Sequence, residues 1–358
     1  MKKLFLLLLI LSQSLAFSQT KDFSIKETIK AAYNIATNFA EKEKVPGMAI
    51  SVSKNGNLLW SEGFGYSNIE EKIEVNPSVT QFRIASISKS LTAAALAKLM
   101  DDGQLDLDES IYTYVPDFPK KAYDFTVRQV GGHIAGIRHY NGSEFILNKK
   151  MSIVEGLDVF KESPLKFEPG TDYSYSTYGW NLLSVVIQNA AKTEFNTYMT
   201  EKIFNPLNMA NTTLDVSYQD MPNRTLFYNK TNSGEIRLGP EVSNEFKVAG
   251  GGFVSTSEDL IKFGNEIISP KIISNSSIAE LVKEQYLTNG KGTGYGVGFG
   301  IGRTKNETVT YSHSGGGIGA RTLLLMYPEE GIVIAIVTNM SGLPIRDFGK
   351  TLEDVFIN

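Results

Sequence analysis

Apolar residues recur at helical spacing near the start of the chain and at strand spacing soon afterwards. From Ser24 to Lys44 they fall three or four positions apart, which predicts an amphipathic helix. Ala49 to Ser53 and Leu58 to Glu62 flank Asn55-Gly56, a pair typical of tight β-hairpin turns. Ser86 to Met100, rich in Ala and Leu, predicts a second helix.

The pattern changes twice further along the chain. Residues 104–250 are predicted to be helical and loop-rich, with the clearest helix at Trp180 to Ala191. The later part predicts a helix capped by Ser257 and Asp259, then three strands and a closing helix. These elements are expected at Ser257–Ile268, Gly292–Gly302, Thr322–Tyr327, Ile332–Thr338 and Phe348–Phe356. Because Gly occupies every second position from Gly292 to Gly302, that strand is expected to have one bare face.

This order of elements predicts one sheet built from both ends of the chain, with a helical lobe between them. The sheet lobe is expected at about residues 24–103 and 251–358, and the helical lobe at about 104–250. No internal repeat or low-complexity linker interrupts the chain. We therefore expect a single two-lobed catalytic unit spanning residues 19–358.

The first 18 residues predict a secretory signal peptide. Met1-Lys2-Lys3 is a basic start, Leu4 to Leu11 is an apolar run too short to span a bilayer, and Ala16-Phe17-Ser18 fits a small-x-small cleavage site. A membrane anchor is the alternative interpretation of this segment. Because no later segment has 18 apolar residues in a row, we expect a periplasmic or secreted protein without a stable membrane anchor.

Composition narrows the chemistry further. The 358 residues carry a formal net charge of -4 and include no cysteine, which excludes disulfides, a thiolate metal site and a lipid-bearing cysteine. His133, His139 and His313 are the only histidines, and none are four residues apart as in a helical zinc site. We therefore expect no metal and no cofactor. Without a basic stripe, no nucleic-acid partner is expected either.

The sequence Ser-x-x-Lys, which can supply a nucleophile and a base, occurs four times. The pairs are Ser18/Lys21, Ser51/Lys54, Ser86/Lys89 and Ser163/Lys166. The first lies at the predicted cleavage site, the second on a strand where the two side chains face opposite sides, and the fourth spans a proline. Only Ser86 and Lys89 begin a helix, where they share one face. A partly desolvated Lys89 can then activate Ser86 for acyl transfer, although an ordinary helix cap with a surface lysine has the same pattern.

Two further segments add candidate chemistry. Tyr175, in Tyr175-Ser176-Thr177, becomes a general base if Lys89 lowers its pKa; a purely structural aromatic cluster is the alternative. His313-Ser314-Gly315-Gly316 precedes a strand, and such a glycine-flanked edge can pair with a substrate backbone. Gly315, Gly317 and Ala320 also match G-x-G-x-x-A, but a dinucleotide site needs a helix next, and a strand is predicted there.

The Ser86/Lys89 pair, the Tyr175 segment and the His313 segment, in this order, resemble the motifs of the serine β-lactamase and penicillin-binding-protein superfamily. The resemblance covers about Ile35 to Asn339 and is strongest to the β-lactamase-related branch that holds the mitochondrial serine β-lactamase-like protein and its bacterial relatives. The matching runs are Phe82–Thr92 and Gly136–Tyr140, with Val45–Gly47, Gly103–Leu107, Tyr175–Gly179 and Gly250–Thr256.

The resemblance implies an α/β (α+β) fold, with an antiparallel sheet flanked by helices and a mainly helical second lobe. It also implies that Ser86 is acylated, that Lys89 and Tyr175 share proton transfer, and that the N–H groups of Ser86 and Gly316 form the oxyanion hole. Tyr175 or Lys89 is the acylation base. His313, Ser314 and Gly315 would stand where many relatives have Lys-Thr-Gly.

Two departures from the family pattern bear on the substrate. Thr177 replaces an Asn that helps to hold the substrate amide, and His313 replaces a permanent lysine charge. Arg321 or Arg138 is the expected replacement for that charge. We therefore expect a serine hydrolase acting on a peptide, ester or peptidoglycan-like substrate. The alternatives are a β-lactamase or D-alanyl-D-alanine carboxypeptidase, a penicillin-binding sensor without turnover, and an assembly protein on the same fold. The oligomeric state stays open.

Overall fold

The computed structural model describes residues 24–216, 219–231 and 233–357. The predicted signal peptide, residues 1–18, lies outside this range. Within the described part of the chain, no helix has the length and apolar character needed to cross a bilayer.

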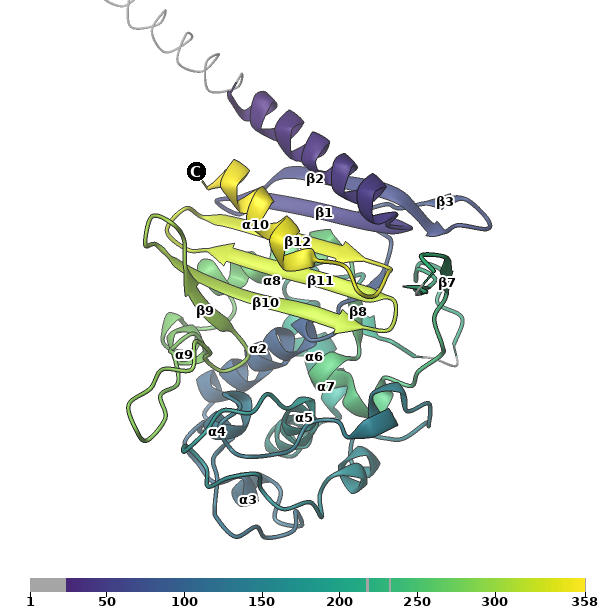
Figure 1. Ribbon diagram of the computed structural model, residues 1–358. Coiled ribbons are helices and arrows are strands. Elements are labelled where there is room, and N and C mark those ends of the chain that lie inside the picture. Colours follow the sequence, from purple (N-terminus) through teal and green to yellow (C-terminus); the bar gives the residue numbers. More distant parts are fainter. Residues whose placement is uncertain (1–23, 217–218, 232, 358) are drawn as a thin grey trace, which may run out of the picture.

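A seven-stranded antiparallel sheet brings the two ends of the sequence together (Figure 1). Its spatial order is β3 (Ile73–Glu74), β2 (Asn57–Asn68), β1 (Gly47–Lys54), β12 (Ile332–Thr338), β11 (Ala320–Tyr327), β10 (Val309–Gly317) and β9 (Gly300–Arg303). β1 pairs with β12 from Met48 opposite Thr338 to Lys54 opposite Ile332. The predicted hairpin is confirmed: Asn55 and Gly56 have φ angles of 51° and 78°, as a type I′ turn requires.

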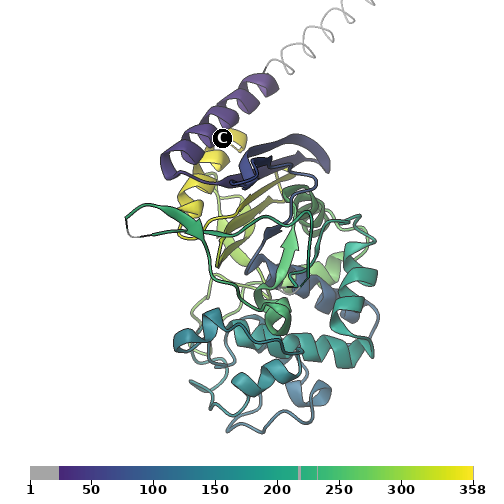
Figure 2. The same cartoon turned by 90° about the vertical axis from the view of Figure 1, so that its right-hand side faces the viewer.

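Helices cover both faces of this sheet, which confirms the predicted fold class. On one face, the helix at residues 24–43 and α10 (Ile345–Phe356) pack side by side, and the rings of Phe39 and Phe348 stack with centroids 4.0 Å apart (Figure 2). On the other face lie α8 (Ser257–Ile268) and the start of α2 (Ile87–Asp101). β12 is buried on both faces, and its first six residues, Ile332 to Val337, are accordingly all apolar.

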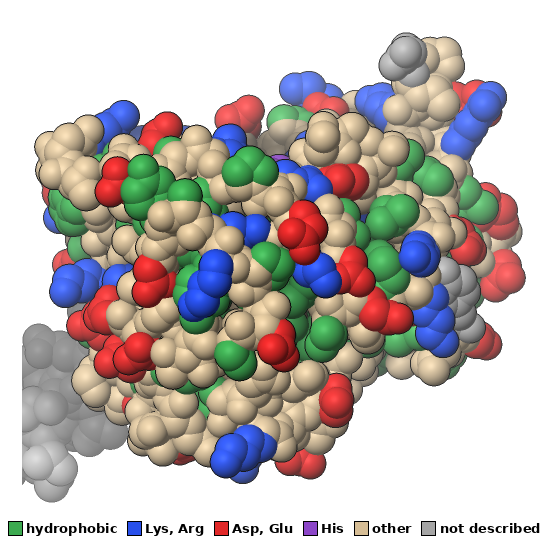
Figure 3. All heavy atoms as spheres, turned by 90° about the horizontal axis from the view of Figure 1, so that it is seen from below, with side chains coloured by type: hydrophobic (Ala, Val, Ile, Leu, Met, Phe, Trp, Pro, Cys, Tyr) green, Lys and Arg blue, Asp and Glu red, His purple; other side chains and the backbone are tan. Residues whose placement is uncertain are grey.

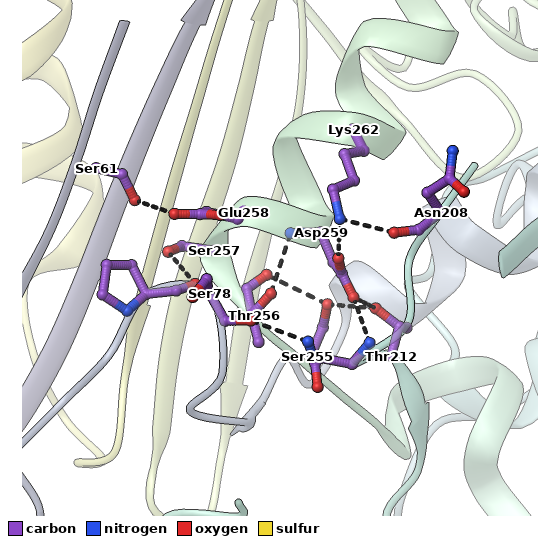
Figure 4. Close-up of polar contacts among 12 residues, drawn as sticks. Ser61, Ser78, Asn208, Thr212, Ser255, Thr256, Ser257, Glu258, Asp259 and Lys262 are labelled. Atoms are coloured by element: carbon purple, nitrogen blue, oxygen red, sulfur yellow. Dashed lines mark hydrogen bonds and ion pairs between the residues drawn. The ribbon is translucent and has the colours of Figure 1, made fainter. Parts of the chain in front are cut away.

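The N-terminus of α8 is capped differently from the expectation. Thr256, rather than Ser257, is the N-cap, and its hydroxyl accepts a hydrogen bond from the N–H of Asp259 at 3.1 Å (Figure 4). The hydroxyl of Ser257 instead lies 2.8 Å from that of Ser51 on β1. Thr212 donates to the buried Asp259 carboxylate at 3.1 Å. The predicted cap is therefore one residue too late, because Ser257 ties the helix to the sheet.

The middle of the chain forms the helical part of the molecule. Its elements are α3 (Ile111–Tyr114), α4 (Val127–Gly131), α5 (Thr177–Ala191), α6 (Phe195–Met199) and α7 (Val248–Gly251), with short 3-10 helices at Gly142–Ile146, Glu155–Val159 and Glu245–Lys247 and a π-helical turn at Thr200–Phe204. α9 (Asn275–Leu281) and two small sheets complete the fold: β4 (Phe82–Arg83), β8 (Phe253–Ser255) and β5 (Thr213–Leu214), and β6 (Tyr228–Lys230) with β7 (Ile236–Leu238). On the face seen in Figure 3, acidic and basic side chains are intermingled.

α2 is the central helix of the molecule. It contacts α5 and α7 as well as the sheet, and Leu91, Leu96 and Leu99 on it are completely buried. Because neighbours surround α2 on nearly all sides, buried residues occur all around it, Ser88, Ser90 and Thr92 among them, and the helix shows little amphipathic pattern. A polar side chain on this helix is therefore buried unless it lies at the helix end.

The predicted strand Gly292–Gly302 is wrong over most of its length. Only Gly300–Arg303 forms a strand, β9, while Gly294 and Gly298 have φ angles of 66° and 84°. A Cβ on Gly298 would lie 2.8 Å from the Cβ of Ala93 and 2.9 Å from the ring of Trp180. These glycines therefore allow turns and close packing on α2 and α5, and their period of two does not indicate a strand.

Candidate active site

Ser86 lies at the N-cap of α2, in a cleft of about 810 Å³ between the sheet and the helical part. Residues from β10, from α5 and from the loop after α4 line this cleft. The structure thus brings Ser86, Tyr175, Thr177, His313, Ser314 and Gly316 to one cavity. Lys89 lies directly beneath Ser86 and is completely buried.

The turn that presents Ser86 has a strained backbone. Ala85 has φ of 47°, a left-handed conformation that residues with a Cβ rarely adopt. Glycines make room for this turn: a Cβ on Gly315 would lie 2.3 Å from the carbonyl oxygen of Ile84 and 3.2 Å from the Cβ of Ala85. Gly315 therefore allows β10 to approach the nucleophile closely.

The amine of Lys89 faces the Ser86 hydroxyl inside the protein. Its Nζ lies 3.1 Å from Ser86 Oγ and 3.2 Å from Thr177 Oγ1, and it also donates to the carbonyl oxygen of Gly250. Burial removes water from the ammonium form and holds the Lys89 pKa well below its ordinary value. Since no acidic side chain in the described part of the chain forms an ion pair with Lys89, nothing offsets this effect.

Tyr175 is beside Ser86, but its ionisation differs from the expectation. Burial raises the pKa of the phenol, and its hydrogen bond with Ser86 opposes that shift only in part. Lys89 Nζ lies 4.8 Å from the centroid of the Tyr175 ring, yet it does not lower that pKa overall. The direction of this shift opposes the phenolate that a lowered Tyr175 pKa would give, and it favours Lys89 over Tyr175 as the acylation base.

The edge of β10 turns a backbone donor toward the cleft. Gly317 pairs with Ala320 across a two-residue turn, so these two residues exchange hydrogen bonds and the next pair, Gly316 with Arg321, does not. The N–H of Gly316 consequently points away from β11. The outer neighbour, β9, pairs with β10 only as far as Ser312. This N–H is thus available at the open edge beside Ser86.

His313 is an uncharged part of the cleft wall. Its Nδ1 lies 2.9 Å from the carbonyl oxygen of Ser314, which can only accept, so Nδ1 carries the proton and Nε2 accepts from the Tyr295 hydroxyl at 2.8 Å. Burial, together with the charge of Lys89, lowers the pKa of His313 to about 3. His313 therefore supplies no positive charge near neutral pH.

Other cations lie where a charge was expected. Arg321 lines the cleft as predicted, and Arg346 on α10 donates to Ser314 Oγ through Nε at 3.2 Å and Nη2 at 2.9 Å. Lys247, whose pKa burial lowers to about 8, lines the cleft as well. No spacing in the sequence links Arg346 or Lys247 to Ser86, so sequence reasoning missed both.

Arg138 does not line the cleft, so of the two arginines expected to supply a charge only Arg321 lies there. The Arg138 guanidinium binds Glu144 through two nitrogens at 2.7 and 3.0 Å. Its remaining N–H groups donate to Ser163 Oγ and to the carbonyl oxygens of His139 and Val159. All five donors are occupied, so Arg138 braces the loop after α4.

Thr177 and the two remaining histidines form the helical wall of the site. The N–H of Thr177 donates to His139 Nδ1 at 3.0 Å, and the N–H of Ser176 donates to His133 Nδ1 at 3.1 Å. The ring of His133 also packs against that of Tyr175, with centroids 4.3 Å apart and the planes tilted by 40°. Nowhere among the described residues do three His, Asp or Glu side chains gather as metal ligands.

A buried serine–lysine pair at the start of a central helix, beside an antiparallel sheet edge, is an arrangement typical of serine hydrolases. The family model described as Beta-lactamase matches residues 34–354. The chain therefore belongs to the beta-lactamase family.

Individual relatives agree with this assignment. The human "Serine beta-lactamase-like protein LACTB, mitochondrial" is 31% identical over 310 residues, which cover 67% of this chain and 56% of that protein. The chain thus spans little more than half the length of this relative. Two solved structures share the fold. The octameric penicillin-binding protein homologue from Pyrococcus abyssi has a TM-score of 0.77 at 24% identity, covering 90% of this chain and 76% of the other. EstCE1, "a hydrolase with promiscuous acyltransferase activity", has a TM-score of 0.80 at 18% identity, covering 94% and 100%.

Proposed function

We propose that this protein is a serine hydrolase that works through an acyl-enzyme on Ser86 and cleaves a peptide, ester or cell-wall amide bond. The observation that carries the proposal is the contact between Ser86 Oγ and a completely buried Lys89 amine, 3.1 Å apart. A lysine held neutral by desolvation can accept the serine proton, whereas an ammonium cannot.

In this mechanism, Lys89 takes the proton as Ser86 Oγ attacks the substrate carbonyl. The resulting oxyanion is held by the N–H groups of Ser86 and Gly316, and the positive end of α2 adds to its stabilisation. Tyr175, still protonated, gives its proton to the leaving group and regains one from the Lys89 ammonium. A water molecule then attacks the acyl-enzyme and loses its proton to Lys89. The Lys89 ammonium passes this proton to Ser86 Oγ as the bond to the acyl group breaks, which releases the product acid and restores the serine hydroxyl and the neutral amine.

The charge of the cleft supports a substrate that carries an anionic group. Its lining includes six basic residues and one acidic residue: Arg83, Lys247, Arg303, Arg321, Arg346 and Lys350, with Glu353. Arg83 is already paired with Asp215 at 2.6 Å. A terminal carboxylate of a peptide or peptidoglycan fragment fits the remaining cations. Because the arginines replace the charge that His313 lacks, a β-lactam stays an alternative substrate.

A substrate panel tests the proposal. Purified protein and Ser86→Ala would be compared on p-nitrophenyl esters, on D- and L-amino acid p-nitroanilides and on a chromogenic cephalosporin. The proposal predicts continuous product release that depends on Ser86. One equivalent of product followed by a stable adduct would instead indicate a non-turnover sensor, and equal rates for both proteins would exclude Ser86 chemistry.

We also propose that the protein is exported, on the basis of residues 1–18 alone. Expression of the full chain in a Gram-negative host, followed by N-terminal sequencing, tests this. A periplasmic protein that begins at residue 19 is expected. A cytoplasmic protein that retains Met1-Lys2-Lys3 would contradict the proposal.

A further inference from the structure

The three histidines near Ser86 are fixed in defined protonation states by their hydrogen bonds. A ring nitrogen that accepts an N–H bond carries no proton, so His139, which accepts from Thr177 at Nδ1, is neutral with its proton on Nε2. Burial and the charge of Lys89 lower the pKa of His139 to about 4, which agrees with the neutral form. His133 has the same tautomer, and His313 has the opposite one.

Of the three histidines, all in the described part of the chain, only His139 combines a place in the cleft lining with a ring N–H that has no protein partner. His313 uses both ring nitrogens in bonds to the protein. The Nε2 of His133 is sealed from solvent, without a partner among the described residues. His139 is half-buried and lines the cleft. Its Nε2 has no hydrogen-bond partner in the described part of the chain and, unlike Nε2 of His133, is not sealed from solvent.

The surroundings of His139 hold this donor in place. Its ring packs against Tyr140 with centroids 4.4 Å apart and meets the edge of the Tyr175 ring at 5.7 Å. The nearby Thr177 hydroxyl already accepts from Lys89 at 3.2 Å and is hydrogen-bonded to Tyr140. Thr177 is therefore occupied within the protein, whereas the His139 N–H is uncharged and has no partner among the described residues.

We infer that His139 donates a hydrogen bond from Nε2 to an amide carbonyl in the acyl part of the substrate. An extended acyl chain that pairs with the edge of β10 turns alternate carbonyl groups away from that strand, toward the helical wall where His139 lies. This inference rests on the proposed acylation of Ser86, and it specifies which acyl groups that reaction prefers. The enzyme selects acyl groups with an amide one residue before the scissile bond over plain fatty acyl groups.

Two esters of equal chain length test this selectivity. N-acetylglycine p-nitrophenyl ester carries the amide, and p-nitrophenyl pentanoate lacks it. In His139→Phe, which keeps a ring but has no donor, the ratio of kcat/KM for the two esters is expected to fall about tenfold, because an unpaired carbonyl then enters the cleft. His139→Gln, which offers a donor and an acceptor, should recover most of the ratio, and the exposed Tyr123→Phe serves as a control. An unchanged ratio in His139→Phe would overturn the inference.

A binding measurement separates this inference from the hydrolase proposal. In Ser86→Ala, which cannot be acylated, long-range ¹H–¹⁵N spectra at pH 7 should show the proton of His139 on Nε2. Adding N-acetylglycine methyl ester should shift this Nε2–H signal, and methyl pentanoate should not. A proton on Nδ1, an imidazolium, or equal shifts with both esters would contradict the role of His139. Failure of the wild type to turn over any ester would count against Ser86 chemistry alone.

Discussion

Replacing Lys89 in two ways shows whether this residue acts as a base or as a charge. Lys89→Met keeps the length of the side chain but removes the amine 3.1 Å from Ser86 Oγ. Lys89→Arg keeps a positive charge but cannot accept a proton, because a guanidinium stays protonated. If Lys89 is the base, both variants lose proton removal from Ser86, and acylation slows equally in the two.

The expected loss is large because both variants lose the amine that lies 3.1 Å from Ser86 Oγ. A positioned general base contributes about 10²- to 10⁴-fold, so we expect acylation to fall about 10³-fold in both variants. In the wild type, kcat/KM should rise with pH through a pKa well below the ordinary lysine value, because burial disfavours the ammonium.

The same pKa shift affects stability, which gives an independent measurement. Between the lowered pKa of folded Lys89 and the unfolded value of 10.5, the unfolded chain binds more protons, so the wild type gains stability as pH rises. Lys89→Met should lose this slope in urea titrations at several pH values.

Stopped-flow acylation by a p-nitrophenyl ester is the assay, with Lys98→Met as the control because Lys98 lies further along α2 in a surface ion pair with Asp102. If Lys89→Arg keeps a tenth or more of the wild-type rate while Lys89→Met is inactive, the lysine acts through its charge and our mechanism is refuted.

Three further predictions concern the rest of the site. Tyr175→Phe should slow hydrolysis of an anilide about 10²-fold and of a p-nitrophenyl ester much less, because only the anilide leaving group needs a proton; equal losses would argue against this donor. Gly315→Ala should lower the free energy of unfolding by roughly 2 kcal/mol, because its Cβ would lie 2.3 Å from a backbone oxygen. Gly302→Ala, whose Cβ meets only the Thr310 hydroxyl at 3.0 Å, is the control. Equal urea midpoints for the two variants would contradict the close approach at Gly315. The free energy of unfolding should fall as pH drops from 6.5 toward 3, because His313 is protonated in the unfolded chain but stays neutral in the folded protein down to its pKa of about 3. A His313→Gln variant with the same pH profile as the wild type would count against this cause.

The sequence predicts the parts of the site that local geometry determines. Ser86 and Lys89 share a face because they are three residues apart on a helix, and the turn at Asn55-Gly56 follows from the conformations these two residues tolerate. The apolar runs of β11 and β12 are likewise predicted well, since strands buried on both faces need such residues.

What the sequence does not predict depends on contacts between distant segments. Arg346 reaches Ser314 only because α10 packs on the sheet, and Arg138 is turned from the cleft by Glu144, which no pattern in the sequence indicates. The direction of the Tyr175 pKa shift depends on burial, which the identity of its neighbours does not give. The glycines near Gly298 repeat every two residues, yet α2 and Trp180 determine their role.

Covalent labelling of Ser86 tests the central claim most directly. The protein would be incubated with a fluorophosphonate, and the modified residue would be located by peptide mass spectrometry, with Ser86→Ala as the control. Our account predicts one label per chain, on Ser86, with none on the variant. Equal labelling of the two proteins, or a label only on another serine, would contradict it.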